Sequence, residues 1–152
     1  MTNINYKIKS FELDTDQGKF YSKDHAGKNL VLFFFPKADT SGCTKEAISF
    51  SNLINEFGNL NTIVIGISKD TVEKQMKFKS KHDLKCILAS DVDIKICSKF
   101  GVWVEKSMYG KKYMGIQRST FLINSDRKIL NIWNKVKVPG HAEEVLEVVK
   151  KL

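Results

Sequence analysis

The sequence lacks the long apolar segments of a membrane protein. Its longest apolar run, residues 30–35, has six residues, whereas a membrane span needs about 20. Residues 1–7 contain no apolar signal segment, so we expect the protein to be cytoplasmic and to have no membrane partner. Repeats and low-complexity linkers are also absent, and only two prolines occur. We therefore expect residues 1–152 to form a single domain.

Cysteine is scarce as well. The chain has three cysteines, and the two that lie closest in sequence are Cys86 and Cys97. The odd number and the wide spacing disfavour a disulfide framework, a zinc site and the Cys-x-x-Cys pair of a disulfide oxidoreductase. The cysteines thus give no sign of a metal centre.

Arginine is almost missing from a basic chain. The net charge is +8, yet Arg118 and Arg127 are the only arginines among 25 basic residues. The lysines are scattered and interleaved with acidic residues, which is typical of a solvated surface. We therefore expect no nucleic-acid partner, although the net charge alone would permit one.

What the sequence does contain is a cysteine at a special place. The apolar residues 29–35 predict a buried strand, and the apolar spacing of residues 42–57 predicts a helix. Between them lies the string PKADTSG, which ends immediately before Cys43. Cys43 therefore falls in the first turn of a helix, where unpaired N–H groups and the helix dipole favour a thiolate. An inert core cysteine would not need this position.

The remaining pattern predicts an α/β fold. It indicates a mixed central sheet with helices on both faces and an amino-terminal β-hairpin. The expected strands are 11–13, 19–21, 29–35, 62–67, 87–89, 117–123 and 128–135, and the expected helices are 42–57, 70–82, 92–100 and one that begins at 139–140. Asp70 and Glu73 form a capping-box pattern for the second helix.

Several strings resemble one known family. The pattern Pro36-x-x-x-Thr40-x-x-Cys43-x-x-Glu46 is similar to the active-site signature of the peroxiredoxins. The strings YGKKYMG at 109–115, RSTFLI at 118–123 and GHAEEVL at 140–146 resemble the peroxiredoxin Q, or bacterioferritin comigratory protein, branch. The resemblance implies a thioredoxin-like fold and a thioredoxin-dependent type of hydroperoxide reductase that works without metal, flavin or other cofactor.

The resemblance and the residue chemistry together suggest roles for Cys43, Thr40, Pro36 and Glu46, and for Arg118. Cys43 is the expected nucleophile, and Arg118 offers a forked guanidinium that can bond both the sulfur and the peroxide. The Thr40 hydroxyl is expected beside the sulfur, or else it caps the helix. Pro36 is expected to exclude water, and Glu46 to orient Arg118. Alternatively, Arg118 is a surface arginine and Glu46 a helix-surface glutamate.

One departure concerns the second cysteine of many members, which stands five residues after the first. Ile48 occupies that position here, on an otherwise polar helix face, and residues 70–82 contain no cysteine. Cys86 and Cys97 both fit apolar core patterns, with Cys97 topologically nearer to Cys43. We therefore expect a one-cysteine mechanism.

In that mechanism a hydroperoxide oxidises Cys43 to a sulfenic acid. An external thiol, such as thioredoxin, glutaredoxin or glutathione, then reduces it. The alternatives are a two-cysteine mechanism resolved by Cys97, or less readily by Cys86, and a peroxide-sensing or chaperone-like binding protein. The expected assembly is a monomer or weak dimer.

Overall fold

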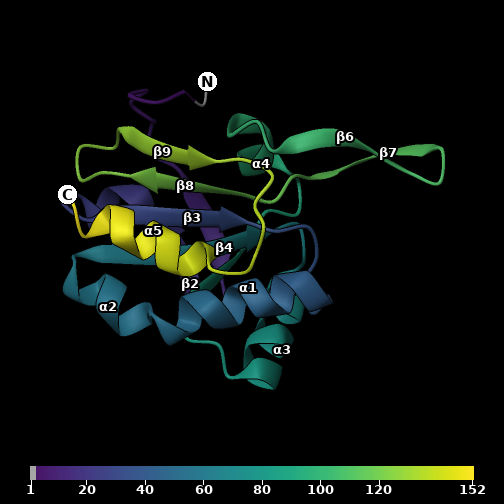
Figure 1. The fold of residues 1–152 in the computed structure, drawn as a ribbon, viewed down its shortest axis with the longest axis horizontal. Helices are drawn as coiled ribbons and strands as arrows, with labels where there is room; N and C mark the ends of the chain where they lie inside the picture. The colour runs from purple at the N-terminus through teal and green to yellow at the C-terminus, as the bar shows by residue number, and fades with distance from the viewer. Residues whose placement is uncertain (1–2) are drawn as a thin grey trace.

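The computed structural model describes residues 3–152. Within them a seven-stranded sheet has the order β2-β1-β5-β4-β3-β8-β9 (Figure 1). Strands β3, β4 and β5 are parallel, and the other neighbours pair antiparallel. The strands are β1 (Glu12–Thr15), β2 (Gly18–Tyr21), β3 (Asn29–Phe34), β4 (Thr62–Ser68), β5 (Ile87–Ser90), β8 (Ser119–Ile123) and β9 (Ile129–Trp133). The expected amino-terminal hairpin is thus confirmed as β1 and β2.

Alternate residues of the central strands build one core on each face of this sheet. On β3, Leu32 and Phe34 join the first core, whereas Val31 and Phe33 join the second. All four side chains are 0% exposed. Such two-sided burial explains why the strand is a continuous apolar run.

Helices cover both faces, as the sequence predicts. Apolar side chains of four helices pack into the second core, and those of one short helix pack into the first. The second core is covered by α1 (Ser41–Asn52), α2 (Ile54–Asn59), α3 (Val72–His82) and α5 (His141–Val149), and the first by α4 (Lys95–Lys99). A 3-10 turn, η1 (Ser22–His25), follows β2. Within residues 3–152 no helix is both long and apolar enough to span a membrane.

The structure corrects three expected boundaries. The helix predicted over 42–57 breaks at Leu53, whose N–H bonds the carbonyls of Phe50 and Ser51 in a tight turn between α1 and α2. The capping residue of α3 is Thr71, whose hydroxyl accepts from Lys74 N–H, and not Asp70. The helix expected over 92–100 is confined to α4.

The sequence prediction missed one element completely. Strands β6 (Trp103–Met108) and β7 (Lys111–Ile116) form a hairpin, and among the described residues they pair only with each other. Residues 103–116 are called the arm below. Tyr109 and Gly110 form its turn with φ of 52° and 78°, the geometry of a tight hairpin. The arm projects from the body, beyond the carboxyl end of β3 (Figure 1).

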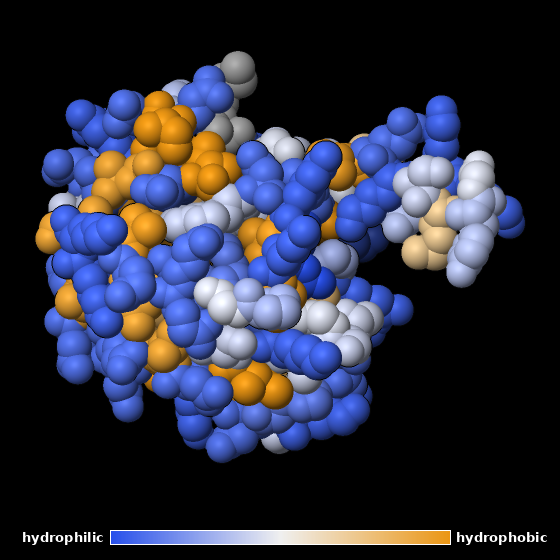
Figure 2. All heavy atoms as spheres, viewed as in Figure 1, coloured by the Kyte–Doolittle hydropathy of each residue, from blue (hydrophilic) through white to orange (hydrophobic). Residues whose placement is uncertain are grey.

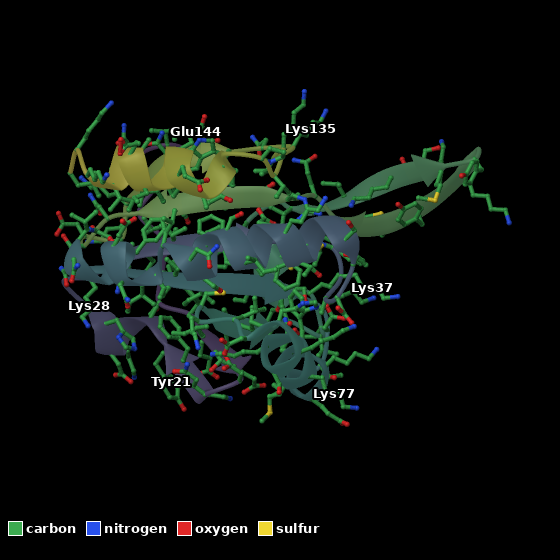
Figure 3. All side chains as sticks on the ribbon, turned by 60° about the horizontal axis from the view of Figure 1, so that its bottom comes forward. Tyr21, Lys28, Lys37, Lys77, Lys135 and Glu144 are labelled. Carbon is green, nitrogen blue, oxygen red and sulfur yellow. The ribbon has the colours of Figure 1, made fainter. Side chains whose placement is uncertain are left out.

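Four lysines illustrate how positive charge is placed on the surface. Lys28, Lys37, Lys77 and Lys135 are exposed and extend outward from separate parts of the fold (Figure 3). The positive charge is therefore dispersed over these parts.

Candidate active site

Cys43 lies at the carboxyl edge of the parallel strands. Strand β3 ends at Phe34, a short loop follows, and Cys43 is the third residue of α1. Its side chain is 1% exposed and packs in the second core with Phe35 and Ala47. The sulfur is thus held between the sheet and the positive end of a 12-residue helix.

Arg118 contacts the sulfur directly. Because β8 runs antiparallel to β3 with Ser119 opposite Phe34, the preceding Arg118 arrives where β3 ends. Its Nη2 lies 3.3 Å from Cys43 Sγ, and its Nη1 lies 2.7 Å from Glu46 Oε1. Burial lowers the pKa of Arg118, but the charges of Glu46 and Cys43 outweigh it and raise that pKa above its ordinary value.

Glu46 holds the second nitrogen of the Arg118 guanidinium. It stands one helical turn after Cys43, is 1% exposed, and its Oε1 accepts a hydrogen bond from Arg118 Nη1. Its Oε2 is buried and has no hydrogen-bond partner among residues 3–152. Burial raises the pKa of Glu46 to about 7, although the charge of Arg118 acts in the opposite direction. Glu46 thus contacts Arg118 and is not a surface residue, whereas its role in orienting Arg118 stays a prediction.

Gly42 is a residue whose part the sequence reasoning missed. A Cβ at this position would lie 3.2 Å from Arg118 Nη2, closer than ordinary van der Waals contact. The glycine therefore leaves room for the guanidinium at the first turn of α1. Glycine is a poor helix former, so its presence in the first turn of a predicted helix was the sequence signal for this role.

Thr40 is the N-cap residue of α1, but its hydroxyl bonds neither the helix nor the sulfur. Its hydroxyl donates to the carbonyl of Lys37 at 2.8 Å, and it makes no side-chain cap bond to α1. Its carbonyl accepts from the N–H of Thr44 at 2.8 Å and from the Thr44 hydroxyl at 2.7 Å. Thr40 thus shapes the loop before Cys43, and the bond its hydroxyl makes is not to the sulfur.

Pro36 is half-buried and directly follows the buried Phe35. The loop after it is anchored to the neighbouring strand end, because Ala38 N–H donates to Asp70 Oδ2 at 2.8 Å and Ser68 Oγ donates to the same oxygen at 2.6 Å. The carboxylate of Asp70 thus holds the loop that precedes Cys43 in place. Asp70 was expected to cap α3 and instead anchors this loop.

Two further polar groups lie near the arginine. Burial lowers the pKa of Lys106 on β6, the charge of Arg118 lowers it further, and the charge of Cys43 opposes this. Lys106 is therefore within electrostatic range of both. His141, at the start of α5, has its Nε2 2.7 Å from the hydroxyl of Thr120, two residues after Arg118. Burial lowers the pKa of His141.

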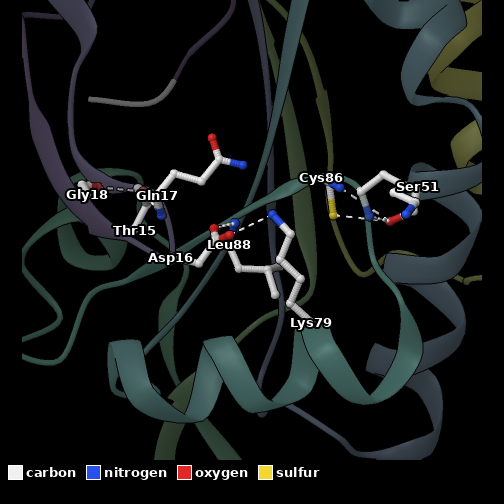
Figure 4. Close-up of polar contacts among 9 residues, drawn as sticks. Thr15, Asp16, Gln17, Gly18, Ser51, Lys79, Cys86 and Leu88 are labelled. Carbon is white, nitrogen blue, oxygen red and sulfur yellow. Dashed lines mark hydrogen bonds and ion pairs between the residues drawn. The ribbon is translucent and has the colours of Figure 1, made fainter.

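The other two cysteines are core residues. Cys86 is 0% exposed, the hydroxyl of Ser51 donates to its sulfur at 3.5 Å, and burial raises its pKa to about 11. Figure 4 shows this contact beside the partly buried ion pair of Lys79 and Asp16, whose Nζ and Oδ2 are 2.6 Å apart.

Cys97 is also 0% exposed, and its N–H donates to Asp91 Oδ2 at 2.7 Å. Burial and the Asp91 carboxylate both raise the pKa of Cys97. It packs in the first core, on the opposite face of the sheet from Cys43. The sequence placed Cys97 topologically nearer to Cys43 than Cys86, but Cys97 and Cys43 lie in different cores. All three cysteines are free, and Ile48 is exposed on α1.

No group of three or more His, Cys, Asp or Glu side chains that could hold a metal ion is found in residues 3–152. The chemical groups that the site assembles are thus a thiol, a guanidinium and a carboxyl. A thiol beside a fixed guanidinium is suited to nucleophilic attack, with the cation stabilising negative charge as it forms or moves.

Comparison with known proteins agrees with this fold. Residues 4–132 match the AhpC/TSA family. The chain is 44% identical to the putative peroxiredoxin Bcp of Coxiella burnetii, covering 94% of this chain and 95% of that one. It is 42% identical to peroxiredoxin Bcp of Bacillus subtilis, with 98% and 96% covered.

Solved structures give the same result. The structure of a cysteine-to-serine variant of PrxQ from Xylella fastidiosa has a TM-score of 0.94 and 36% identity, with 99% of this chain and 97% of that one covered. The bacterioferritin comigratory protein of Xanthomonas campestris has a TM-score of 0.88 and 39% identity, with 93% and 90% covered.

These matches identify the class first: the chain belongs to the AhpC/TSA family, and it is a peroxiredoxin with a thioredoxin-like fold. Within that class its relatives are peroxiredoxin Q, or bacterioferritin comigratory, proteins. The resemblance stated from the sequence is thereby confirmed, and the enzyme class follows. Membership implies thiol-dependent peroxidase activity.

Proposed function

We propose that the protein reduces hydrogen peroxide and organic hydroperoxides at Cys43 by a one-cysteine mechanism. The contact of 3.3 Å between Arg118 Nη2 and Cys43 Sγ carries the proposal. The Cys43 thiolate attacks one peroxide oxygen, the O–O bond breaks, and a proton joins the departing oxygen. The products are a Cys43 sulfenic acid and an alcohol or water.

Arg118 acts in this step as the positioned cation. Its Nη1 donates to Glu46 and its Nη2 donates to the Cys43 sulfur. Nη2 therefore points to the place where negative charge moves from the sulfur to the peroxide oxygen. Glu46 is the positioning residue for the Arg118 guanidinium. Pro36 and Thr40 shape the loop through which the peroxide reaches Cys43. When a peroxide binds, the Thr40 hydroxyl turns from the carbonyl of Lys37 to the substrate.

Organic hydroperoxides are included because of a relative. The structure of the Xanthomonas campestris protein is described in terms of alkyl peroxide reduction activity. This chain shares 39% of its sequence with that protein over 93% of its length.

Recycling is proposed to use an external thiol such as thioredoxin, glutaredoxin or glutathione. Cys97 lies in the core on the other face of the sheet, and Cys86 is buried under Ser51, so neither thiol supports an internal disulfide without repacking. We further propose that residues 1–152 act as a single cytoplasmic domain, as a monomer or weak dimer.

Intact-mass spectrometry tests the proposal. One equivalent of hydrogen peroxide should add one oxygen to the wild type, and Cys43→Ser should show neither this addition nor peroxide consumption. The buried position of Cys43 makes circular dichroism of the variant a necessary control for folding. Turnover retained by Cys43→Ser would refute the assignment of the nucleophile.

A further inference from the structure

The arm exposes large side chains that proteins usually cover. Tyr109 at its tip is 98% exposed, and Met108, Tyr113 and Met114 are each at least 44% exposed. Figure 2 shows the arm standing clear of the body, with hydrophobic residues among its hydrophilic ones. Tyrosine and methionine are enriched in the cores of protein interfaces, and an exposed cluster of them indicates a binding surface.

The arm is also basic. Its residues include Lys106, Lys111 and Lys112 but only one acidic residue, Glu105, so its net charge is +2. The lysines of the arm have no ion-pair partner among the described residues. A surface of this composition is complementary to an acidic protein.

One face of the arm leads to the candidate active site. Lys106 pairs with Tyr113, and Met108 pairs with Lys111, so these four side chains share a face. The stem of Lys106 crosses Gly115, where a Cβ would lie 3.2 Å from Lys106 Cδ. The side chain thus runs toward the base of the arm, and the shift in its pKa agrees with a place near Arg118 and Cys43.

We propose that the arm is the docking surface for an acidic thiol protein that recycles Cys43. This proposal rests on the proposed function, in which Cys43 sulfenic acid meets an outside thiol. The partner's thiol attacks the Cys43 sulfur, a mixed disulfide forms and water leaves. A second thiol of the partner then displaces the Cys43 thiolate, so the partner leaves oxidised and Cys43 is reduced.

The size and charge of the arm favour this partner over a second copy of the chain. Two six-residue strands are about 20 Å long, and one face of them is small beside the roughly 1,200–2,000 Å² of a stable interface. A small contact suits a partner that must leave in every cycle. A second copy carries the same net charge of +8 and would be repelled.

Steady-state kinetics with two reductants test the proposal. The variant Lys111→Glu/Lys112→Glu reverses the charge of the arm, and Tyr109→Ser removes its exposed ring. With an acidic thioredoxin and its reductase, we expect the charge reversal to raise the KM for thioredoxin roughly tenfold, and less so at high salt. With dithiothreitol, and in single-turnover oxidation by hydrogen peroxide, both variants should match the wild type.

The matched control is Lys150→Glu/Lys151→Glu. It makes the same change of charge at the far end of α5, on the opposite side of the molecule from the arm (Figure 1). It should leave the KM for thioredoxin unchanged.

Three outcomes would overturn the docking role. They are an unchanged KM in the arm variants, an equal rise in the control, and a lack of thioredoxin turnover in a wild type that dithiothreitol supports. A wild-type dimer that only Tyr109→Ser abolishes would reassign the arm to self-association. Failure of the proposed function is distinguishable, because turnover with dithiothreitol would then be absent in the wild type.

Discussion

The guanidinium of Arg118 lies against Gly42, where any other residue would place a Cβ. A Cβ there would lie 3.2 Å from Arg118 Nη2, the nitrogen that contacts the Cys43 sulfur at 3.3 Å. The geometry of the thiol and the guanidinium therefore depends on a missing methyl group. A substitution at position 42 can therefore move the guanidinium without removing its charge.

Gly42→Ala should slow the oxidation of Cys43 by hydrogen peroxide about tenfold, because the guanidinium must move while its charge stays. Stopped-flow fluorescence of the single turnover measures this rate. Gly58→Ala on α2 is the matched control, since a Cβ there meets nothing within 4 Å. Equal rates for Gly42→Ala and the wild type would show that the contact tolerates displacement.

Arg118→Lys should be nearly as damaging as Arg118→Ala. Removal of one preorganised donor typically costs about 10²–10³-fold in rate, and an ammonium group cannot bond Glu46 and the sulfur in the fixed fork geometry. The single-turnover rate with peroxide is the measurement. Recovery of most of the rate by lysine would mean that charge alone matters at this position.

Glu46 should make stability fall as pH rises. Burial raises its pKa from 4.5 to about 7, so the folded state binds its proton more tightly than the unfolded state between these values. The free energy of unfolding of the wild type, relative to Glu46→Gln, should therefore decrease from pH 4.5 to pH 7 by on the order of 1–3 kcal/mol.

Urea denaturation of both proteins at several pH values measures this difference. Glu56→Gln on α2 replaces an exposed glutamate and should show no such trend. A difference between Glu46→Gln and wild type that stays constant with pH would contradict the raised pKa.

Cys86→Ser/Cys97→Ser should retain most turnover with dithiothreitol, apart from the cost of placing two hydroxyl groups in the core. Peptide mapping without reduction should find Cys43 as sulfenic acid, and as sulfinic acid when no thiol is present. A Cys43–Cys97 disulfide in most molecules would instead require α4 to leave the first core, and would establish a two-cysteine mechanism.

The fold was largely predictable because its central strands are buried on both faces. Strands β3 and β4 appear in the sequence as continuous apolar runs between turn residues. The break at Leu53 was not predictable from periodicity, since the apolar spacing continues across it. The arm was missed because its exposed strands carry lysines at positions where buried strands carry apolar residues.

The site was predictable where spacing determines position. Cys43 and Glu46 are one helical turn apart, and Arg118 precedes a strand that pairs with β3, so the structure brings the three together. Their catalytic roles stay predictions. The direction of the Thr40 hydroxyl depends on a local rotamer, and the need for Gly42 depends on a contact 76 residues away, which a sequence pattern does not carry.

Because all three thiols are buried, the size of a reagent decides how easily it reaches them. Cys43 is 1% exposed, and Cys86 and Cys97 are 0% exposed. A molecule as small as hydrogen peroxide needs little room, whereas a bulky aromatic disulfide reagent must wait for the first turn of α1 to open. The rate at which such a reagent modifies Cys43 in the native protein, relative to its rate with the unfolded protein, therefore measures how often that turn opens.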